Sequence, residues 1–187
     1  MRKLAIAGIV LSLGACAPLM DATHQGPIHQ NAGKRTIGVI IDDEHVEEVT
    51  MVNINKADER LRNAHINVVS FNGVVLLIGQ VPSEDLRQRA ATVASNTLRV
   101  RQVQNGLTVE PNASAAVRSY DSWLTTKIKV QFAADSTINA GRVKVVTENG
   151  VIYLMGLVTQ HEADRAASIA QQTDGAQRVV KAFEYID

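Results

Sequence analysis

Hydrophobic positions in this chain form two long runs with almost the same pattern. Residues 72–79 read Asn-Gly-Val-Val-Leu-Leu-Ile-Gly, and 77 positions later residues 149–156 read Asn-Gly-Val-Ile-Tyr-Leu-Met-Gly. Each Asn-Gly pair lies between two β-branched runs, and this pair tolerates positive φ at both central positions of a type I′ turn. The pattern therefore predicts one β-hairpin in each of two copies of a single module.

The same order of elements is predicted around each hairpin, namely helix, strand, strand, helix and strand. The predicted ranges are 44–57, 66–71, 74–80, 84–97 and 100–109 in the first copy, and 121–134, 142–147, 151–157, 160–173 and 177–186 in the second. Because strand-helix-strand crossovers are right-handed, the last strand should return beside the hairpin. Each module is then an α+β unit, with a three-stranded mixed sheet covered by two helices.

Cap residues mark several of these helix starts. Asp42 and Asp43 favour the N-terminus of the first helix, and Ser83 can cap the second. Thr159 and Glu162 have the spacing of a capping box. The modules should occupy residues 42–110 and 120–187, with a linker at 111–119. Modules of about 65 residues bury little surface, so docking of one copy on the other should help stability.

The first residues have the pattern of an export signal. Arg2 and Lys3 precede an apolar run that is too short to span a bilayer, and Leu13-Gly14-Ala15-Cys16 follows it. This tetrapeptide resembles the bacterial lipobox, which implies cleavage of residues 1–15 and acyl chains on Cys16. The alternative is an ordinary signal peptide with a chance cysteine. Cys16 is the only cysteine, so no internal disulfide can use it.

Residues 16–41 should form the lipidated N-terminus and a flexible tether, because the stretch from Pro18 to Gly38 holds two prolines, three glycines and few large apolar residues. Ala17 follows the cysteine in place of the aspartate that retains many lipoproteins on the inner membrane, which implies an outer-membrane location on the periplasmic side. His24 and His29 lie in this segment. Without further ligands they do not make a metal site, and none is predicted.

Charge and chemistry exclude several classes of function. Lys and Arg number 19 and so do Asp and Glu, and loss of Arg2 and Lys3 with the signal leaves a small negative balance. The overall charge of the chain therefore gives no indication of nucleic-acid binding. No Walker-type phosphate loop or metalloprotease motif is present, and His45, His65 and His161 have no companion motif. The chain is predicted to be non-enzymatic, without a cofactor other than the acyl chains.

The first helix of the second copy is apolar on two sides. Leu124, Ile128 and Phe132 make the stripe expected to cover the sheet. A second set of side chains lies on a different side of this helix and is not needed to cover the sheet. We predict that these residues bind anionic phospholipid: Trp123, Thr126, Lys127, Lys129, Val130, Ala133 and Ala134. Tryptophan favours the headgroup region, where lysines can approach phosphates. The first copy has His45 and Glu48 at the positions of Trp123 and Thr126.

The two Asn-Gly-Val runs, each within a helix-strand-strand-helix-strand unit, resemble BON domains. With the lipobox and the tether, the chain is similar to outer-membrane lipoproteins that carry two such domains. This resemblance implies binding of anionic phospholipid and a role in outer-membrane integrity. Two alternatives stay open: Trp123 and Val130 pack between the two modules, or the Trp123 side of the helix binds a partner protein of the cell envelope.

Overall fold

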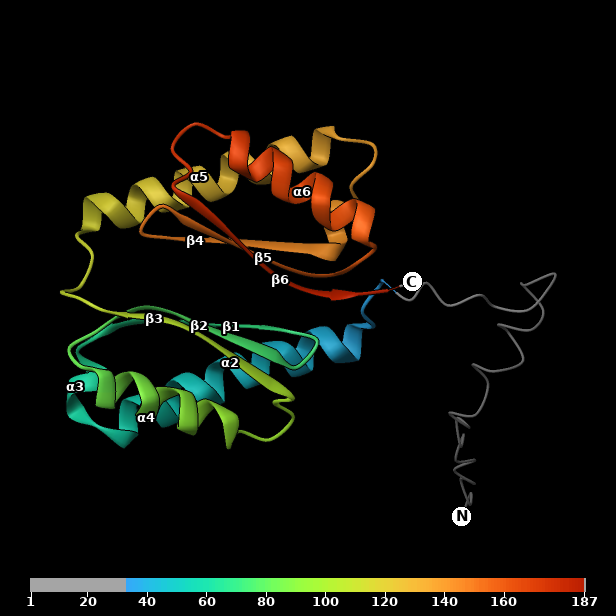
Figure 1. Ribbon diagram of the computed structural model, residues 1–187. Helices are drawn as coiled ribbons and strands as arrows, with labels where there is room; N and C mark the ends of the chain where they lie inside the picture. The colour runs from blue at the N-terminus through green and yellow to red at the C-terminus, as the bar shows by residue number, and fades with distance from the viewer. Residues whose placement is uncertain (1–32, 187) are drawn as a thin grey trace, which may run out of the picture. The chain divides into compact units, whose positions relative to one another are not determined.

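The computed structural model describes residues 33–186, which belong to one compact unit (Figure 1). The predicted signal peptide, Cys16 and most of the predicted tether lie outside the described residues. The described residues form two successive α+β modules, each with its own three-stranded sheet.

The first module begins with the long helix α2 (Ile37–Ala57) and the single turn α3 (Glu59–Arg62). The strands β1 (His65–Phe71) and β2 (Val74–Val81) form an antiparallel hairpin. Helix α4 (Glu84–Ser95) then leads to β3 (Gln102–Val109), which pairs with β2 in parallel. The sheet order β1-β2-β3 is the mixed sheet predicted from the sequence.

The second module repeats this topology. Helix α5 (Ala115–Ala134) and the short 3₁₀ turn η1 (Ala140–Arg142) precede β4 (Val143–Glu148) and β5 (Val151–Val158). Helix α6 (Gln160–Gln172) connects to β6 (Arg178–Tyr185), which pairs with β5 in parallel. In both modules the helices cover one face of the sheet (Figure 1).

The hairpin turns have the backbone that the Asn-Gly pairs predict. The φ angle is +53° at Asn72 and +76° at Gly73, and it is +48° at Asn149 and +73° at Gly150. Positive φ at both central residues is the type I′ geometry, and it matches the right-handed twist of the flanking strands. The predicted capping box of Thr159 and Glu162 is also confirmed.

Two predicted helix starts and one predicted side-chain cap are wrong. Helix α2 begins at Ile37, where the Thr36 hydroxyl accepts a hydrogen bond from the Val39 amide, so the helix extends into the predicted tether. Helix α5 begins at Ala115 with Ser114 as its cap, inside the predicted linker. Ser83 precedes α4, but its hydroxyl bonds the Asp85 carboxylate instead of the helix amides. Alanine and valine around residue 116 gave no apolar periodicity from which the earlier start could be predicted.

Asp43 does not cap a helix, contrary to the sequence prediction, but holds the hairpin turn. Its carboxylate accepts hydrogen bonds from the Asn72 amide at 2.8 Å, the Gly73 amide at 2.9 Å and the Ser70 hydroxyl at 2.8 Å. In the second module Asp121 accepts from the amides of the Asn-Gly pair at 2.8 Å and 2.9 Å. One buried aspartate on the first helix of each module thus ties that helix to its hairpin.

Replacing Asp43 with Asn should destabilise the protein by about 2–3 kcal/mol at neutral pH, because charge-assisted bonds to the turn amides are lost. Burial opposes ionisation, but the bonds from Gly73, Ser70 and Asn72 outweigh it, and the pKa of Asp43 lies below its ordinary value of 3.8. A depressed folded pKa contributes stability above pH 3.8, and this contribution is lost as the pH falls through the folded pKa.

Urea unfolding of both proteins, at neutral pH and below pH 3.8, measures this effect. The difference in free energy of unfolding between the wild type and Asp43→Asn should be smaller in acid than at neutral pH. Equal stability at neutral pH would show that the carboxylate does not hold the turn.

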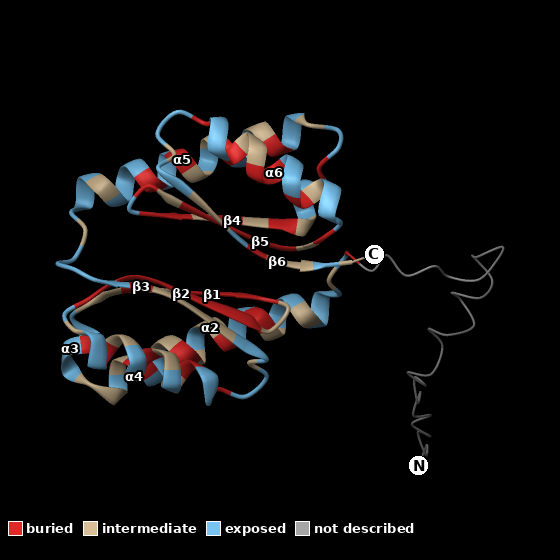
Figure 2. Ribbon diagram, in the orientation of Figure 1, coloured by how far each residue is buried: buried red, intermediate tan, exposed pale blue. Residues whose placement is uncertain are grey.

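The two sheets pack against each other through the faces that the helices leave uncovered. Side chains alternate along a strand, so Val68, Val75 and Leu77 join the helix-side core while their neighbours point to the other module. The shared cluster contains Val69, Phe71, Val74, Leu76, Ile78, Tyr153, Met155 and Ala182. Figure 2 shows that the central strands β2 and β5 are largely buried, as a sheet covered on both faces requires, whereas β3 and β6 at the edges are mostly exposed or half-buried. The expected docking of the two copies is therefore observed.

Candidate functional site

An exposed aromatic surface lies on α5, on the side away from its core stripe. Leu124, Ile128 and Phe132 are buried as predicted. Trp123 keeps 52% of its surface exposed and Val130 keeps 63%. Neither side chain is part of the contact between the two modules, so the predicted alternative that places them there is wrong. Because other residues of α5 already cover the sheet, packing of the core does not explain a tryptophan at this exposed position.

Four neighbours on α5 form with Trp123 what we call the Trp123 face: Tyr120, Lys127, Val130 and Ala134. The Tyr120 and Trp123 rings lie 5.3 Å apart between centroids, at an interplanar angle of 34°. The Lys127 ammonium lies 5.1 Å from the centre of the Trp123 ring on its face, a cation–π arrangement. Val130 and Ala134 lie within about 20° of Trp123 around the helix axis.

Tyr120 was missed by the sequence prediction. The ring is 46% exposed and lies three residues before Trp123, the spacing at which helical side chains meet. Its hydroxyl lies against Gly175, where an added Cβ would overlap it, so the tyrosine covers the loop after α6. The pair Tyr-x-x-Trp was therefore a usable signal, but the predicted helix began at residue 121 and excluded it.

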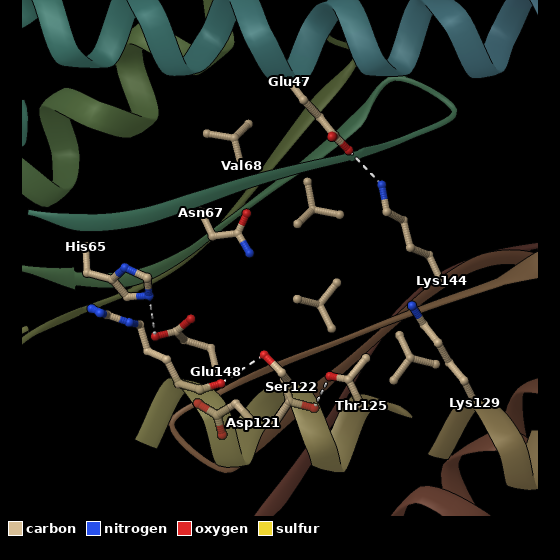
Figure 3. A pocket seen from close by; sticks show the side chains of 15 residues that line it. Glu47, His65, Asn67, Val68, Asp121, Ser122, Thr125, Lys129, Lys144 and Glu148 are labelled. Carbon is tan, nitrogen blue, oxygen red and sulfur yellow. Dashed lines mark hydrogen bonds and ion pairs between the residues drawn. The ribbon is translucent and has the colours of Figure 1, made fainter. Parts of the chain in front are cut away.

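The other predicted site residues do not all join this face. Thr126 and Ala133 are exposed at its flank, about 60–80° around the helix from Trp123. Lys129 lies about 120° from Trp123, farther around the helix on the same side as Thr126 and Ala133, and lines a cleft together with Thr125 and Ser122 (Figure 3). The structure therefore separates Lys129 from Trp123, which the prediction had grouped. Cys16 lies outside the described residues.

The positive charge near Trp123 is confined to the surroundings of Lys127. Lys127 approaches the Asp174 carboxylate at 3.6 Å, and Asp174 is fully exposed, so water screens this pair strongly. At the positions of Tyr120, Trp123 and Thr126, α2 carries Asp42, His45 and Glu48, and at those of Val130 and Ala134 it carries Val52 and Lys56. Helix α2 therefore lacks the aromatic pair of α5.

Other kinds of site were sought in the described part of the chain. No group of three metal-ligating side chains comes together among residues 33–186. Over the same residues, none of the helices combines the length and the apolar character that crossing a bilayer requires.

Comparison with known proteins defines the class. The BON domain family model matches residues 42–111 and 120–187. The chain belongs to the BON-domain family, as the resemblance predicted. It is 39% identical over 188 residues to the outer membrane lipoprotein DolP of Haemophilus influenzae, an alignment that covers 100% of this chain and 97% of that protein.

Two further relatives share less of their length with this chain. A 21 kDa hemolysin of Actinobacillus pleuropneumoniae is 37% identical over 152 residues, covering 81% of this chain and 78% of the relative. Osmotically-inducible protein Y of Escherichia coli is 34% identical over 124 residues, covering 65% and 62%.

Proposed function

We propose that this protein is a non-enzymatic, acyl-anchored lipoprotein on the periplasmic side of the outer membrane, which binds anionic phospholipid through the Trp123 face and supports outer-membrane integrity. The anchor is the Cys16 of the lipobox-like tetrapeptide. The similarity to a protein named as an outer membrane lipoprotein, over the full chain, supports the location.

The observation that carries the lipid proposal is the exposed pair of Tyr120 and Trp123 beside Lys127. Both aromatic rings join an apolar body to a polar group, and such rings are enriched at the level of lipid headgroups. Lys127 can approach a lipid phosphate there, a contribution of about 1 kcal/mol near an anionic surface. The exposed Val130 and Ala134 extend the apolar strip along the helix, so α5 can lie flat in the headgroup layer.

The acyl anchor lowers the affinity that the Trp123 face needs in order to bind the membrane. Anchoring keeps the modules at high effective concentration near the bilayer, so even a weak second contact is populated. The Trp123 face would then orient the modules, while the first module acts as a scaffold.

Vesicle co-sedimentation of a chain that starts at residue 17, and so lacks the anchor, tests the proposal without any partner protein. It retains Thr36, the cap of α2, which a shorter fragment would lose. We expect binding to phosphatidylglycerol vesicles, none to phosphatidylcholine vesicles, and weaker binding at high salt because salt screens Lys127. Binding to neither kind of vesicle would assign the face to a protein partner instead.

A further inference from the structure

The loop between α4 and β3 carries an exposed leucine, Leu98, followed by Arg99 in a left-handed backbone conformation. Leu98 keeps 83% of its surface exposed, and the φ angle of Arg99 is +71°. Left-handed backbone is strained for a residue with a side chain, so glycine is the usual choice there. The Arg99 guanidinium pairs with the Asp42 carboxylate, but both groups are about half exposed, and such surface pairs add little stability.

The second module has the ordinary form of the same loop. Asp174 and Gly175 follow Leu98 and Arg99 by 76 positions, the spacing that relates the two copies after their hairpins. In both modules the residue two positions further on donates its amide to the carbonyl of the turn glycine, which confirms the match. Gly175 adopts φ of +100° without the strain that a side chain brings. The fold of the module therefore requires neither the leucine nor the arginine.

The difference between the modules extends to the helix that borders this loop. In the second module the Lys127 ammonium lies 3.6 Å from the Asp174 carboxylate. At the position of Lys127 the first module has Val49, and Val49 and Leu98 together line a hollow of about 180 Å³. That volume suits one branched aliphatic side chain. An ion pair in one module is thus replaced by an apolar hollow in the other.

The exposed side of α2 beside this hollow combines apolar and acidic residues. Ile41 is 58% exposed and Val52 is 43% exposed, and both lie within about 40° of Glu48 around the helix axis. Glu44 and Glu48 are exposed and form no ion pair within residues 33–186, and α2 contains no Lys or Arg before Lys56. What we call the Leu98 surface consists of Ile41, Glu44, Glu48, Val49, Val52 and Leu98.

We infer that the Leu98 surface binds a basic amphipathic helix of another protein. The surface extends about 16 Å along α2, a length over which such a helix presents apolar side chains at i, i+4 and i+7. One of these side chains fills the hollow beside Leu98, and Lys or Arg side chains pair with Glu44 and Glu48. The same carboxylates disfavour an anionic membrane. The inference does not depend on the lipid proposal, because the Leu98 surface and the Trp123 face share no residue.

Fluorescence anisotropy tests the inference on the unanchored chain from residue 17, with a labelled peptide of three Leu-Ala-Ala-Leu-Lys-Ala-Lys repeats. In a helix this sequence places leucines on one side and lysines beside them. We expect this peptide to bind, with lower affinity at high salt, and the analogue with Glu in place of Lys not to bind. Absence of binding by the basic peptide, or equal binding by both, would overturn the inference.

Leu98→Ser should weaken binding of the basic peptide about tenfold, because it removes the apolar anchor without a change of charge. Its Tm should equal that of the wild type, since Leu98 is exposed. Glu48→Lys should weaken binding by a similar factor, because attraction becomes repulsion. Glu110→Lys, the same charge reversal at an exposed position just after β3, should leave binding unchanged.

Vesicle co-sedimentation separates this surface from the lipid site. Leu98→Ser should sediment with phosphatidylglycerol vesicles as the wild type does, and Trp123→Glu should bind the basic peptide as the wild type does. Loss of vesicle binding by Leu98→Ser would make the Leu98 surface part of the membrane contact and overturn the protein partner. Unchanged peptide binding by both Leu98→Ser and Glu48→Lys would place the peptide elsewhere and overturn the inference as well.

Discussion

Trp123→Glu should weaken binding to phosphatidylglycerol vesicles about 50-fold while leaving the fold intact. About half of the Trp123 surface is exposed and available for burial in the headgroup layer, which corresponds to about 1–2 kcal/mol. A glutamate adds about 1 kcal/mol of repulsion from the lipid phosphates. Because each 1.4 kcal/mol is a factor of about ten, the sum explains the expected loss.

His45→Glu is the matched control, since His45 holds the same position on α2 and is exposed. This variant should bind vesicles as the wild type does. Thermal melts of both variants separate lost contact from lost folding. The structure predicts unchanged melts, because Trp123 is half exposed and its ring lies beside Tyr120 and Lys127 of the same helix. A Trp123→Glu protein that unfolds, or that binds normally, would contradict the exposed lipid face.

Gly79→Ala should destabilise the protein by about 3–4 kcal/mol and lower its Tm by about 10 °C. The residue has φ of +119°, and an added Cβ would overlap the backbone carbonyl oxygen of His65 on the neighbouring strand. Backbone cannot move aside as a flexible side chain can, so the hairpin must shift. Gly156 approaches the Arg142 carbonyl in the same way, which shows that the close approach belongs to the module.

Gly38→Ala provides the contrast for this experiment. Gly38 lies in α2, and the nearest atom to an added Cβ is the Thr36 hydroxyl at 3.8 Å. Alanine is favoured over glycine in a helix by up to about 1 kcal/mol, so this variant should be slightly more stable than the wild type. Calorimetry of the two variants measures both effects. Equal midpoints would mean that Gly79 is not held at its close contact with β1.

The sequence predicts the topology of both modules because local rules determine it. Asn-Gly pairs specify the turns, and a right-handed crossover through the second helix returns the last strand beside the hairpin. The role of Asp43 could not be predicted from its neighbours, since its partners at residues 70, 72 and 73 come close only after folding. The matching positions of Asp43 and Asp121 in the two copies were the available signal.

The candidate site was predictable in part. A second apolar side on α5 follows from helical periodicity, and the exposure of Trp123 agrees with it. Lys129 was grouped with Trp123 because the two are near in sequence, whereas the structure places Lys129 in the lining of the cleft. The cleft itself arises from the docking of two modules, and no pattern within either copy encodes it.

Quenching of Trp123 fluorescence by brominated lipids tests the lipid-binding proposal most directly, because Trp123 is the only tryptophan in the chain. The unanchored chain would be mixed with phosphatidylglycerol vesicles whose acyl chains carry bromine near the headgroup. If the Trp123 face enters the headgroup layer, emission shifts to shorter wavelength and bromine quenches it. Binding to these vesicles with unshifted, unquenched emission would show that another surface holds the lipid.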